Sequence, residues 1–300
     1  MDRRRFAHAT IALAGAWPVA KALGGGEPTQ KIWGEMHAER WRAIEARVGG
    51  RLGVATLDTA TGELAGQRLD ERFPMCSTFK ALAAALVLAR VDAGEDRLDR
   101  RIVVTRADLL EWAPVTSKRV GGAGMTVAEL CEAAITVSDN TAANLLLASA
   151  GGPAGVTAFV RRLGDDVTRL DRTEPTLNEG TPGDARDTST PRAMAHTLRR
   201  LMLGDALSDQ GRAQLVQWMT ANTTGGNRLR AGVPFDWRVA DKTGTGSLGS
   251  TNDVGVLWPP RRAPLVVVTY LTGTQAPSAA REAALADVAR SLTGAWTRAS

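Results

Sequence analysis

The alternation of apolar and polar residues divides the chain into two strand-forming ends and a helical middle. Near the start, residues 32–48 carry apolar side chains at helical spacing. LGVATLD (52–58) and GELAGQR (62–68) then flank the turn at 59–62, a pattern typical of a β-hairpin. The first end of the chain therefore predicts one helix followed by two paired strands.

Helical patterns fill the middle of the chain, from about residue 70 to 220. They predict helices over residues 78–92, 126–134, 141–149, 156–163, 191–203 and 209–222. Strand patterns return at 237–244, 252–258 and 263–273, and an amphipathic helix at 279–292 closes the chain.

The order of these elements indicates the fold class. Three consecutive strands joined by short links are antiparallel, because parallel neighbours need long crossovers, and the first hairpin most simply joins the same sheet. We predict a two-domain α/β (α+β) fold with an antiparallel sheet flanked by helices. Both chain ends build this domain (27–70 and 220–300), and an all-helical domain (71–219) is inserted. The cleft between two such domains is the first place to look for a site.

The first 26 residues predict an export signal. The basic start DRRRF precedes the apolar run ATIALAGAW, which is too short to span a membrane, and then small residues. Arg3-Arg4-Arg5-Phe6 fits the twin-arginine pattern of bacterial export; a basic tail is the alternative. No other window is apolar enough for a transmembrane helix. We expect a mature periplasmic protein outside the membrane.

Composition and charge exclude several functions. A hydrophobic fraction of 44% is ordinary for a globular protein. Three of the five net positive charges lie in residues 1–26, and the later basic pairs form no stripe, so we expect no nucleic-acid partner. The histidines are scattered, at His8, His37 and His196, so we expect no metal or other cofactor.

One lysine stands at the head of an apolar run. Lys80 precedes residues 81–89, which carry no charge, and a buried ammonium is costly unless it is paired. Ser77 lies three residues earlier, on the same helix face. A serine hydroxyl needs an adjacent base to become a good nucleophile, and burial favours a neutral lysine that can be such a base. The pair predicts a serine nucleophile, although this spacing alone is common.

Two further stretches strengthen that hypothesis. Ser138-Asp139-Asn140 precedes a predicted helix, and Lys242-Thr243-Gly244 ends a predicted strand. In isolation the first could be a helix cap and the second an ordinary strand end. All three motifs in this order, with domain-scale gaps, indicate one catalytic site.

With these motifs the chain resembles the penicillin-recognising serine enzymes, and more closely the class A β-lactamases. The segment RTEPTLN (172–178) looks like the family's R-x-E-P-x-L-N segment in its omega loop, here around 169–187, and the resemblance runs from about residue 30 to 295. It implies hydrolysis of penicillins and cephalosporins through a serine acyl-enzyme, which confers antibiotic resistance. It also implies a monomer acting on a small-molecule β-lactam.

The resemblance implies a set of catalytic residues. Ser77 attacks the lactam carbonyl, Ser138 passes a proton to the lactam nitrogen, and Glu174 and Asn178 position and deprotonate the deacylating water. Whether Lys80 or Glu174 starts acylation is open.

It also implies a substrate-binding set. Asn140 holds the substrate amide, and the backbone N–H groups of Ser77 and Thr245 form an oxyanion hole. A pocket for the substrate carboxylate has one wall formed by Lys242, Thr243, Gly244 and Thr245. Arg228 supplies the arginine of this pocket, and Trp112 lies at the mouth of the cleft. The alternatives are a surface charge for Arg228 and plain packing for Trp112.

Further expectations follow from the resemblance. In relatives the residues matching Arg172 and Asp187 form an ion pair at the neck of the loop, and the Glu174–Pro175 bond is a candidate for cis. Cys76 and Cys131 lack the partners that some relatives provide, so we expect two unpaired, mostly buried thiols.

Two other functions remain open at this stage. A D,D-peptidase shares the three motifs but lacks the glutamate of the omega loop. A non-catalytic β-lactam sensor domain usually sits on a membrane-anchored transducer.

Overall fold

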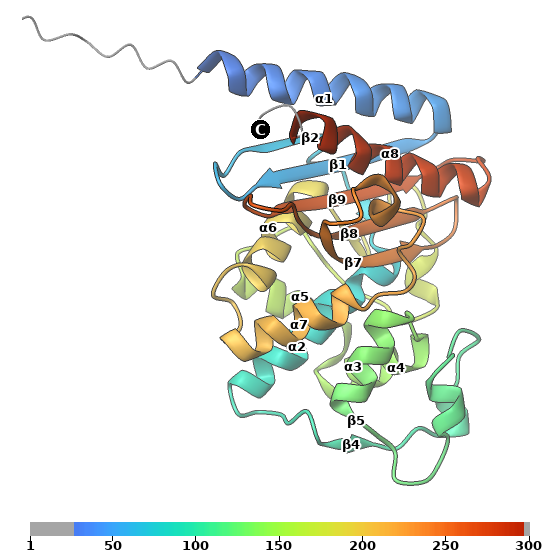
Figure 1. The fold of residues 1–300 in the computed structure, drawn as a ribbon. Coiled ribbons are helices and arrows are strands. Elements are labelled where there is room, and N and C mark those ends of the chain that lie inside the picture. The colour runs from blue at the N-terminus through green and yellow to red at the C-terminus, as the bar shows by residue number, and fades with distance from the viewer. Residues whose placement is uncertain (1–26, 297–300) are drawn as a thin grey trace, which may run out of the picture.

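A five-stranded antiparallel sheet joins the two ends of the chain, in the order β2-β1-β9-β8-β7 (Figure 1). The computed structural model describes residues 27–296, with the side chains of 37–293, so the predicted export signal lies outside the described residues. The strands are β1 (Arg51–Asp58), β2 (Leu64–Gln67), β7 (Arg238–Thr245), β8 (Thr251–Trp258) and β9 (Leu265–Thr272). This sheet confirms the predicted fold class.

Two helices from opposite chain ends cover one face of the sheet. They are α1 (Glu27–Val48) and α8 (Ser278–Trp296), which lie together above the strands in Figure 1. Their apolar side chains, among them the fully buried Trp41 and Leu285, pack with strand residues into one core.

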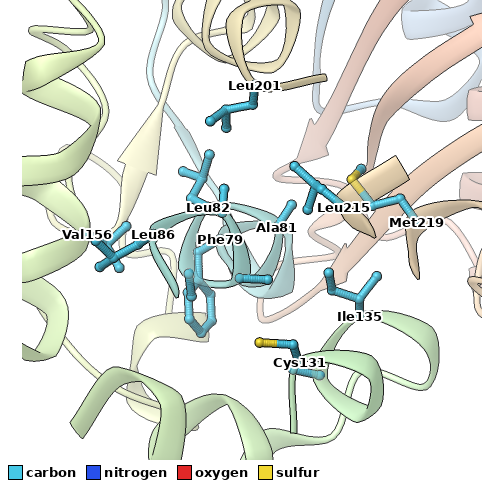
Figure 2. Close-up of a cluster of buried hydrophobic side chains, with 14 of the residues drawn as sticks. Phe79, Ala81, Leu82, Leu86, Cys131, Ile135, Val156, Leu201, Leu215 and Met219 are labelled. Carbon is cyan, nitrogen blue, oxygen red and sulfur yellow. The ribbon is translucent and has the colours of Figure 1, made fainter. Parts of the chain in front are cut away.

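The helical part of the chain lies against the other face. Its helices are α2 (Phe79–Asp92), α3 (Val127–Thr136), α4 (Asn140–Ser149), α5 (Gly152–Arg162), α6 (Pro191–Met202) and α7 (Asp209–Thr220). Helix α2 is buried on every side over residues 79–88, as expected of a helix without a polar face. Figure 2 shows its Phe79, Leu82 and Leu86 within a cluster of side chains from the surrounding helices.

The inserted helical domain also contains two short β-ladders. Strand β3 (Phe73–Pro74) pairs with β6 (Thr188–Ser189), and β4 (Arg101–Ile102) pairs with β5 (Met125–Thr126). Two residues are too few to show alternation, which is why the sequence pattern missed them. The domain boundaries at residues 70 and 220 stay a prediction.

A short 3₁₀ turn, η1 (Cys76–Thr78), connects β3 to α2 and lies against the end of β7. A Cβ atom at Gly244 would lie 2.7 Å from the carbonyl oxygen of Met75, so only glycine allows this approach. The Asn252 amide also donates to the carbonyls of Pro74 (2.9 Å) and Met75 (3.1 Å). These contacts fix the position of Ser77 relative to the sheet.

The omega loop is closed at its neck by an ion pair between the partly buried Arg172 and the buried Asp187. Arg172 Nε lies 2.6 Å from Asp187 Oδ2, and Asp187 Oδ1 accepts from the backbone N–H groups of Asp171 (2.8 Å) and Arg172 (2.9 Å). The Glu174–Pro175 bond is cis. Both expectations for this loop are confirmed.

Cys76 and Cys131 are free and buried, as expected. Burial raises the pKa of the Cys76 thiol to about 12, so the thiol stays protonated at neutral pH.

Within residues 27–296, no single helix has the length and hydropathy of a membrane span. Helices α4 and α5 reach those values only when taken together, and the chain bends by 73° between them.

Candidate active site

The structure brings all twelve predicted site residues together around a cavity of about 300 Å³ between the sheet and the helical domain. Nine of them line it, from Ser77 on one wall to Arg228 on another. Lys80, Glu174 and Lys242 lie behind the walls, and the side chains of Lys80 and Lys242 are completely buried.

One carboxylate oxygen joins the nucleophile candidate to its lysine. Ser77 Oγ donates to Glu174 Oε1 at 3.0 Å, and Lys80 Nζ lies 3.0 Å from the same oxygen. The side chains of both Lys80 and Glu174 are 0% exposed. The buried ammonium is thus paired, as its position in an apolar helix requires.

Lys80 makes three further contacts on its other side. Its ammonium donates to the Ser138 carbonyl (2.9 Å), the Ser138 hydroxyl (3.2 Å) and Asn140 Oδ1 (2.6 Å). Burial lowers the pKa of Lys80, and the nearby Glu174 carboxylate opposes that shift. Lys80 therefore connects the Glu174 side of the site to the Ser138 side.

Asp139 explains how Ser138 and Asn140 reach the cleft. It caps α4 by accepting from the Ala142 N–H (2.9 Å), and its other oxygen accepts from the Thr116 N–H (3.0 Å). Ser138 adopts a φ of 59°, a left-handed conformation that costs about 1–3 kcal/mol and needs such support. The cap hypothesis is therefore confirmed for Asp139, and the two residues that flank it, Ser138 and Asn140, line the cavity.

Asn144 clamps the backbone of Glu174, and the sequence analysis missed it. Its amide donates to the Glu174 carbonyl (2.9 Å) and its oxygen accepts from the Glu174 N–H (3.0 Å). Asn144 lies one helical turn beyond Asn140 on the same face of α4, which was the available signal. The Asn178 amide, in turn, donates to Glu174 Oε2 at 2.5 Å.

Lys242 approaches the site from the sheet. Its ammonium donates to the Ser138 hydroxyl (3.2 Å) and the Thr243 carbonyl (3.0 Å). Burial, followed by the charge of Lys80, lowers the pKa of Lys242 to about 7. The charge of Lys242 is therefore sensitive to pH near neutrality.

Arg228 is a buried part of the site, so the alternative of a surface charge is wrong. It is 6% exposed and donates to the carbonyls of Gly244 (2.9 Å) and Asn252 (2.8 Å) and to Thr245 Oγ1 (2.8 Å). Glu282 on α8, which the sequence analysis missed, lies 3.3 Å from Nη2. The guanidinium is held at the ends of β7 and β8.

Trp112 and Thr224 complete the cavity wall. Trp112 is 56% exposed and donates from its indole to the Val137 carbonyl (3.0 Å), so it is not packed in a core. The Thr224 hydroxyl shares a hydrogen bond with Thr243 and another with Asn222 Oδ1 (2.8 Å). Thr224 belongs to no sequence motif and was not predicted.

The arrangement suits acyl transfer to a substrate that carries a carboxylate. A hydroxyl, a carboxylate and an amine lie within hydrogen-bond reach of one another. Two further buried cations, Lys242 and Arg228, lie at β7. Among the side chains of residues 37–293, no three histidines, cysteines or carboxylates group as a metal site would.

Comparisons with known proteins agree with this geometry. Residues 37–296 match the model of the β-lactamase enzyme family. The chain is 50% identical over 283 residues to β-lactamase OXY-2 of Klebsiella oxytoca, covering 94% of this chain and 95% of the relative. It is 50% identical over 258 residues to β-lactamase CTX-M-8 of Citrobacter amalonaticus, covering 86% and 88%.

Solved structures give the same result. An ancestral class A β-lactamase (GNCA) is 64% identical with a TM-score of 0.85, and the match covers 86% of this chain and 99% of that one. The class A β-lactamase of the last common ancestor of Gram-negative bacteria (GNCA4) is 63% identical with a TM-score of 0.85, covering 87% and 99%. The chain belongs to the class A β-lactamases, serine hydrolases that open the β-lactam ring.

Proposed function

We propose that Ser77 is the nucleophile and that Glu174 accepts its proton. The hydrogen bond of 3.0 Å from Ser77 Oγ to Glu174 Oε1 carries this proposal, since a general base must lie within such reach. The Ser77 oxygen attacks the lactam carbonyl carbon and forms an ester. The lactam C–N bond then breaks and leaves a nitrogen that needs a proton.

Ser138 supplies that proton to the nitrogen. Lys80 lies between the two ends of the route, 3.0 Å from Glu174 Oε1 and 3.2 Å from the Ser138 hydroxyl. The proton taken from Ser77 can return through Lys80 to Ser138, so the enzyme ends acylation with its protons balanced.

The developing oxyanion is held by backbone donors. The donors are the N–H groups of Ser77, in η1, and Thr245, at the end of β7, and the packing of η1 against that strand supports this assignment. One such donor typically contributes about 3–4 kcal/mol to the transition state.

The two cations bind the substrate carboxylate. Arg228 lines the cavity and Lys242 lies buried behind its wall, while Thr243 and Thr245 add hydroxyl groups and Gly244 leaves space for the ligand. Asn140 holds the side-chain amide of the substrate at the Lys80 side. The exposed indole of Trp112 packs against the substrate at the mouth of the cavity.

Deacylation uses Glu174 and Asn178. Asn178 donates to Glu174 Oε2, while its own Oδ1 is buried and receives no hydrogen bond from the described residues. A water molecule between the two side chains would satisfy that oxygen and present its lone pair to the ester. Glu174 takes the proton of this water as it attacks.

We also propose that residues 1–26 direct export through the twin-arginine route, and that the mature monomer destroys small-molecule β-lactams in the periplasm. The supporting observation is the sequence Arg3-Arg4-Arg5-Phe6 before a short apolar run. Replacing Arg3 and Arg4 with lysine should abolish periplasmic activity in cell fractions, and undiminished activity there would contradict this route.

Turnover of a chromogenic cephalosporin tests the catalytic assignment. Purified protein lacking residues 1–26 should complete many turnovers per molecule. Ser77→Ala should complete none, whereas Ser117→Ala, at an exposed serine, should match the unaltered protein. A single stoichiometric burst would contradict the proposal and would fit the peptidase or sensor alternatives instead.

A further inference from the structure

A buried carboxyl group lies beneath the carboxylate pocket and has no place in the mechanism above. Asp253 on β8 pairs across the sheet with Thr243, which lines the cavity, and is 0% exposed. Its Oδ2 accepts from the Leu229 N–H (3.1 Å), while its Oδ1 is buried and receives no hydrogen bond from the described donors. A buried polar atom of this kind calls for an explanation.

Another carboxyl group lies beside Asp253. Asp241 lies on β7 two residues before Thr243, on the same face of the strand, and its side chain is within hydrogen-bond reach of Asp253. Asp241 already accepts from the Asn222 amide (2.6 Å) and from Arg230 Nε (2.6 Å). Two carboxyl groups can hydrogen-bond to one another only if one of them carries a proton.

We propose that Asp253 holds a proton on Oδ1 at neutral pH and donates it to Asp241, so that the pair carries one negative charge beneath the carboxylate pocket. This proton explains the orphaned oxygen. Asp253 is the member that holds it because Asp241 receives two donors, one of them a guanidinium, while Asp253 receives only a backbone N–H.

The electrostatic surroundings agree with this placement. Burial, followed by the charge of Asp241, raises the pKa of Asp253 well above its usual range. The charge of Arg228 and the Leu229 N–H act in the opposite direction. Two ionised carboxylates in contact and away from water would repel each other strongly, as in catalytic carboxyl pairs that share a proton.

The proton on Asp253 changes the net charge around the pocket that would bind the substrate carboxylate. Around Asp253 lie three cations, Lys242, Arg228 and Arg230, and two other anions, Asp241 and Glu282. With Asp253 neutral and Lys242 protonated, the net charge of these six groups is one positive charge, which is available to the substrate carboxylate. With Asp253 ionised, their net charge is zero. Asp253 is therefore a positioning residue of the carboxylate pocket, an inference that rests on the proposed role of Lys242 and Arg228.

Infrared spectroscopy of the ligand-free protein tests the proton directly. The difference spectrum between unaltered protein and Asp253→Asn at neutral pH should contain the carbonyl stretch of a protonated carboxylic acid. The control Asp236→Asn changes an exposed aspartate and should give carboxylate bands alone. Carboxylate bands alone in the Asp253→Asn difference spectrum would overturn the proposal.

Kinetics of a carboxylate-bearing penicillin test the consequence. An asparagine at 253 can donate its N–H to Asp241 and accept from the Leu229 N–H, so Asp253→Asn should keep KM within about twofold, with the pH dependence of kcat/KM unchanged. Asp253→Ala loses both bonds and should raise KM about tenfold with a smaller change in kcat. A shift of the pH midpoint in Asp253→Asn would mean that a charge had been removed, and would overturn the proposal.

The two tests separate this inference from the function on which it rests. The infrared result needs no substrate, so it stands even if Arg228 and Lys242 do not bind the carboxylate. Conversely, an absent acid band together with a raised KM in Arg228→Ala would overturn the shared proton alone.

Discussion

Ser77 donates a hydrogen bond of 3.0 Å to Glu174, a residue 97 positions further along the chain. The first stands in η1, directly before the central helix α2, and the second in the omega loop, which the Arg172–Asp187 ion pair closes. The nucleophile and its base therefore depend on different elements. Changes to α2 should affect acylation, whereas changes to the omega loop should affect both steps, because Glu174 is the proposed base in each.

Lys80→Ala should slow acylation by about 10²- to 10⁴-fold, because the variant loses the amine that contacts both Glu174 Oε1 and the Ser138 hydroxyl. Stopped-flow measurement of acylation by a penicillin gives the rate, and the melting temperature shows that the fold survives. The exposed Lys118 provides a matched control, Lys118→Ala. An acylation rate near that of the control would exclude the proton route through Lys80.

Asp187→Ala should loosen the omega loop and slow deacylation. Asp187 is buried and accepts three hydrogen bonds at the neck, and breaking one side of such a buried pair costs about 3–5 kcal/mol. Limited proteolysis reports cleavage within the loop, and rapid-quench experiments report deacylation. Asp184→Ala, on the same loop, serves as the control because its partner Arg186 is exposed. Unchanged proteolysis and deacylation would mean that the neck pair does not hold the loop.

Arg228→Ala should raise KM for penicillins about tenfold, because the pocket loses a buried cation that would bind the substrate carboxylate. Clavulanate-type inhibitors, which carry the same carboxylate, should weaken in parallel. Steady-state kinetics give the KM values, and Arg199→Ala, which changes an exposed arginine, is the control. Equal KM values in the two variants would remove Arg228 from the pocket.

The pH profile of kcat/KM should report Lys242. Its pKa in the free enzyme is about 7, so its charge is lost as pH rises through that value, and kcat/KM for a carboxylate-bearing substrate should fall there. Lys242→Arg keeps its charge and should move this fall to higher pH. A profile that stays flat well above pH 7 in the unaltered enzyme would contradict the assignment.

The lowered pKa of Lys242 also affects the stability of the fold. The unfolded chain keeps the Lys242 proton up to its ordinary value of 10.5, whereas the folded chain releases it near 7. The folded state binds fewer protons between these values, so the contribution of Lys242 to the free energy of unfolding rises with pH across that window. Lys242→Met should flatten that rise in urea-unfolding measurements, and an unaltered slope would contradict the shift.

Much of the sheet and of the candidate site could be predicted from the sequence, because their signals are local. Strands β7, β8 and β9 are each eight residues long, enough to show a strand pattern. Ser77 and Lys80 share one helix face. The family motifs supplied the partners that lie far away in the chain, such as Glu174.

What could not be predicted depends on contacts between distant segments. The ladders β3–β6 and β4–β5 are two residues long and leave no pattern. Arg228 is buried because it donates to carbonyl groups at the ends of β7 and β8. These carbonyls lie side by side only once the sheet has formed. The contact of Asp253 with Asp241 likewise needs the register of those two strands.

The role of Glu174 in deacylation is the central claim, and mass spectrometry of Glu174→Ala tests it most directly. The variant loses the proposed acylation base but keeps Ser77 and Lys80, so slower acylation should remain detectable. The deacylating water has no other base, so the ester should persist. After mixing with a penicillin, the variant should show the intact ligand mass on a peptide containing Ser77. The unaltered enzyme and the loop control Glu179→Ala should show little adduct. Free turnover by Glu174→Ala, or an adduct on another peptide, would contradict the account.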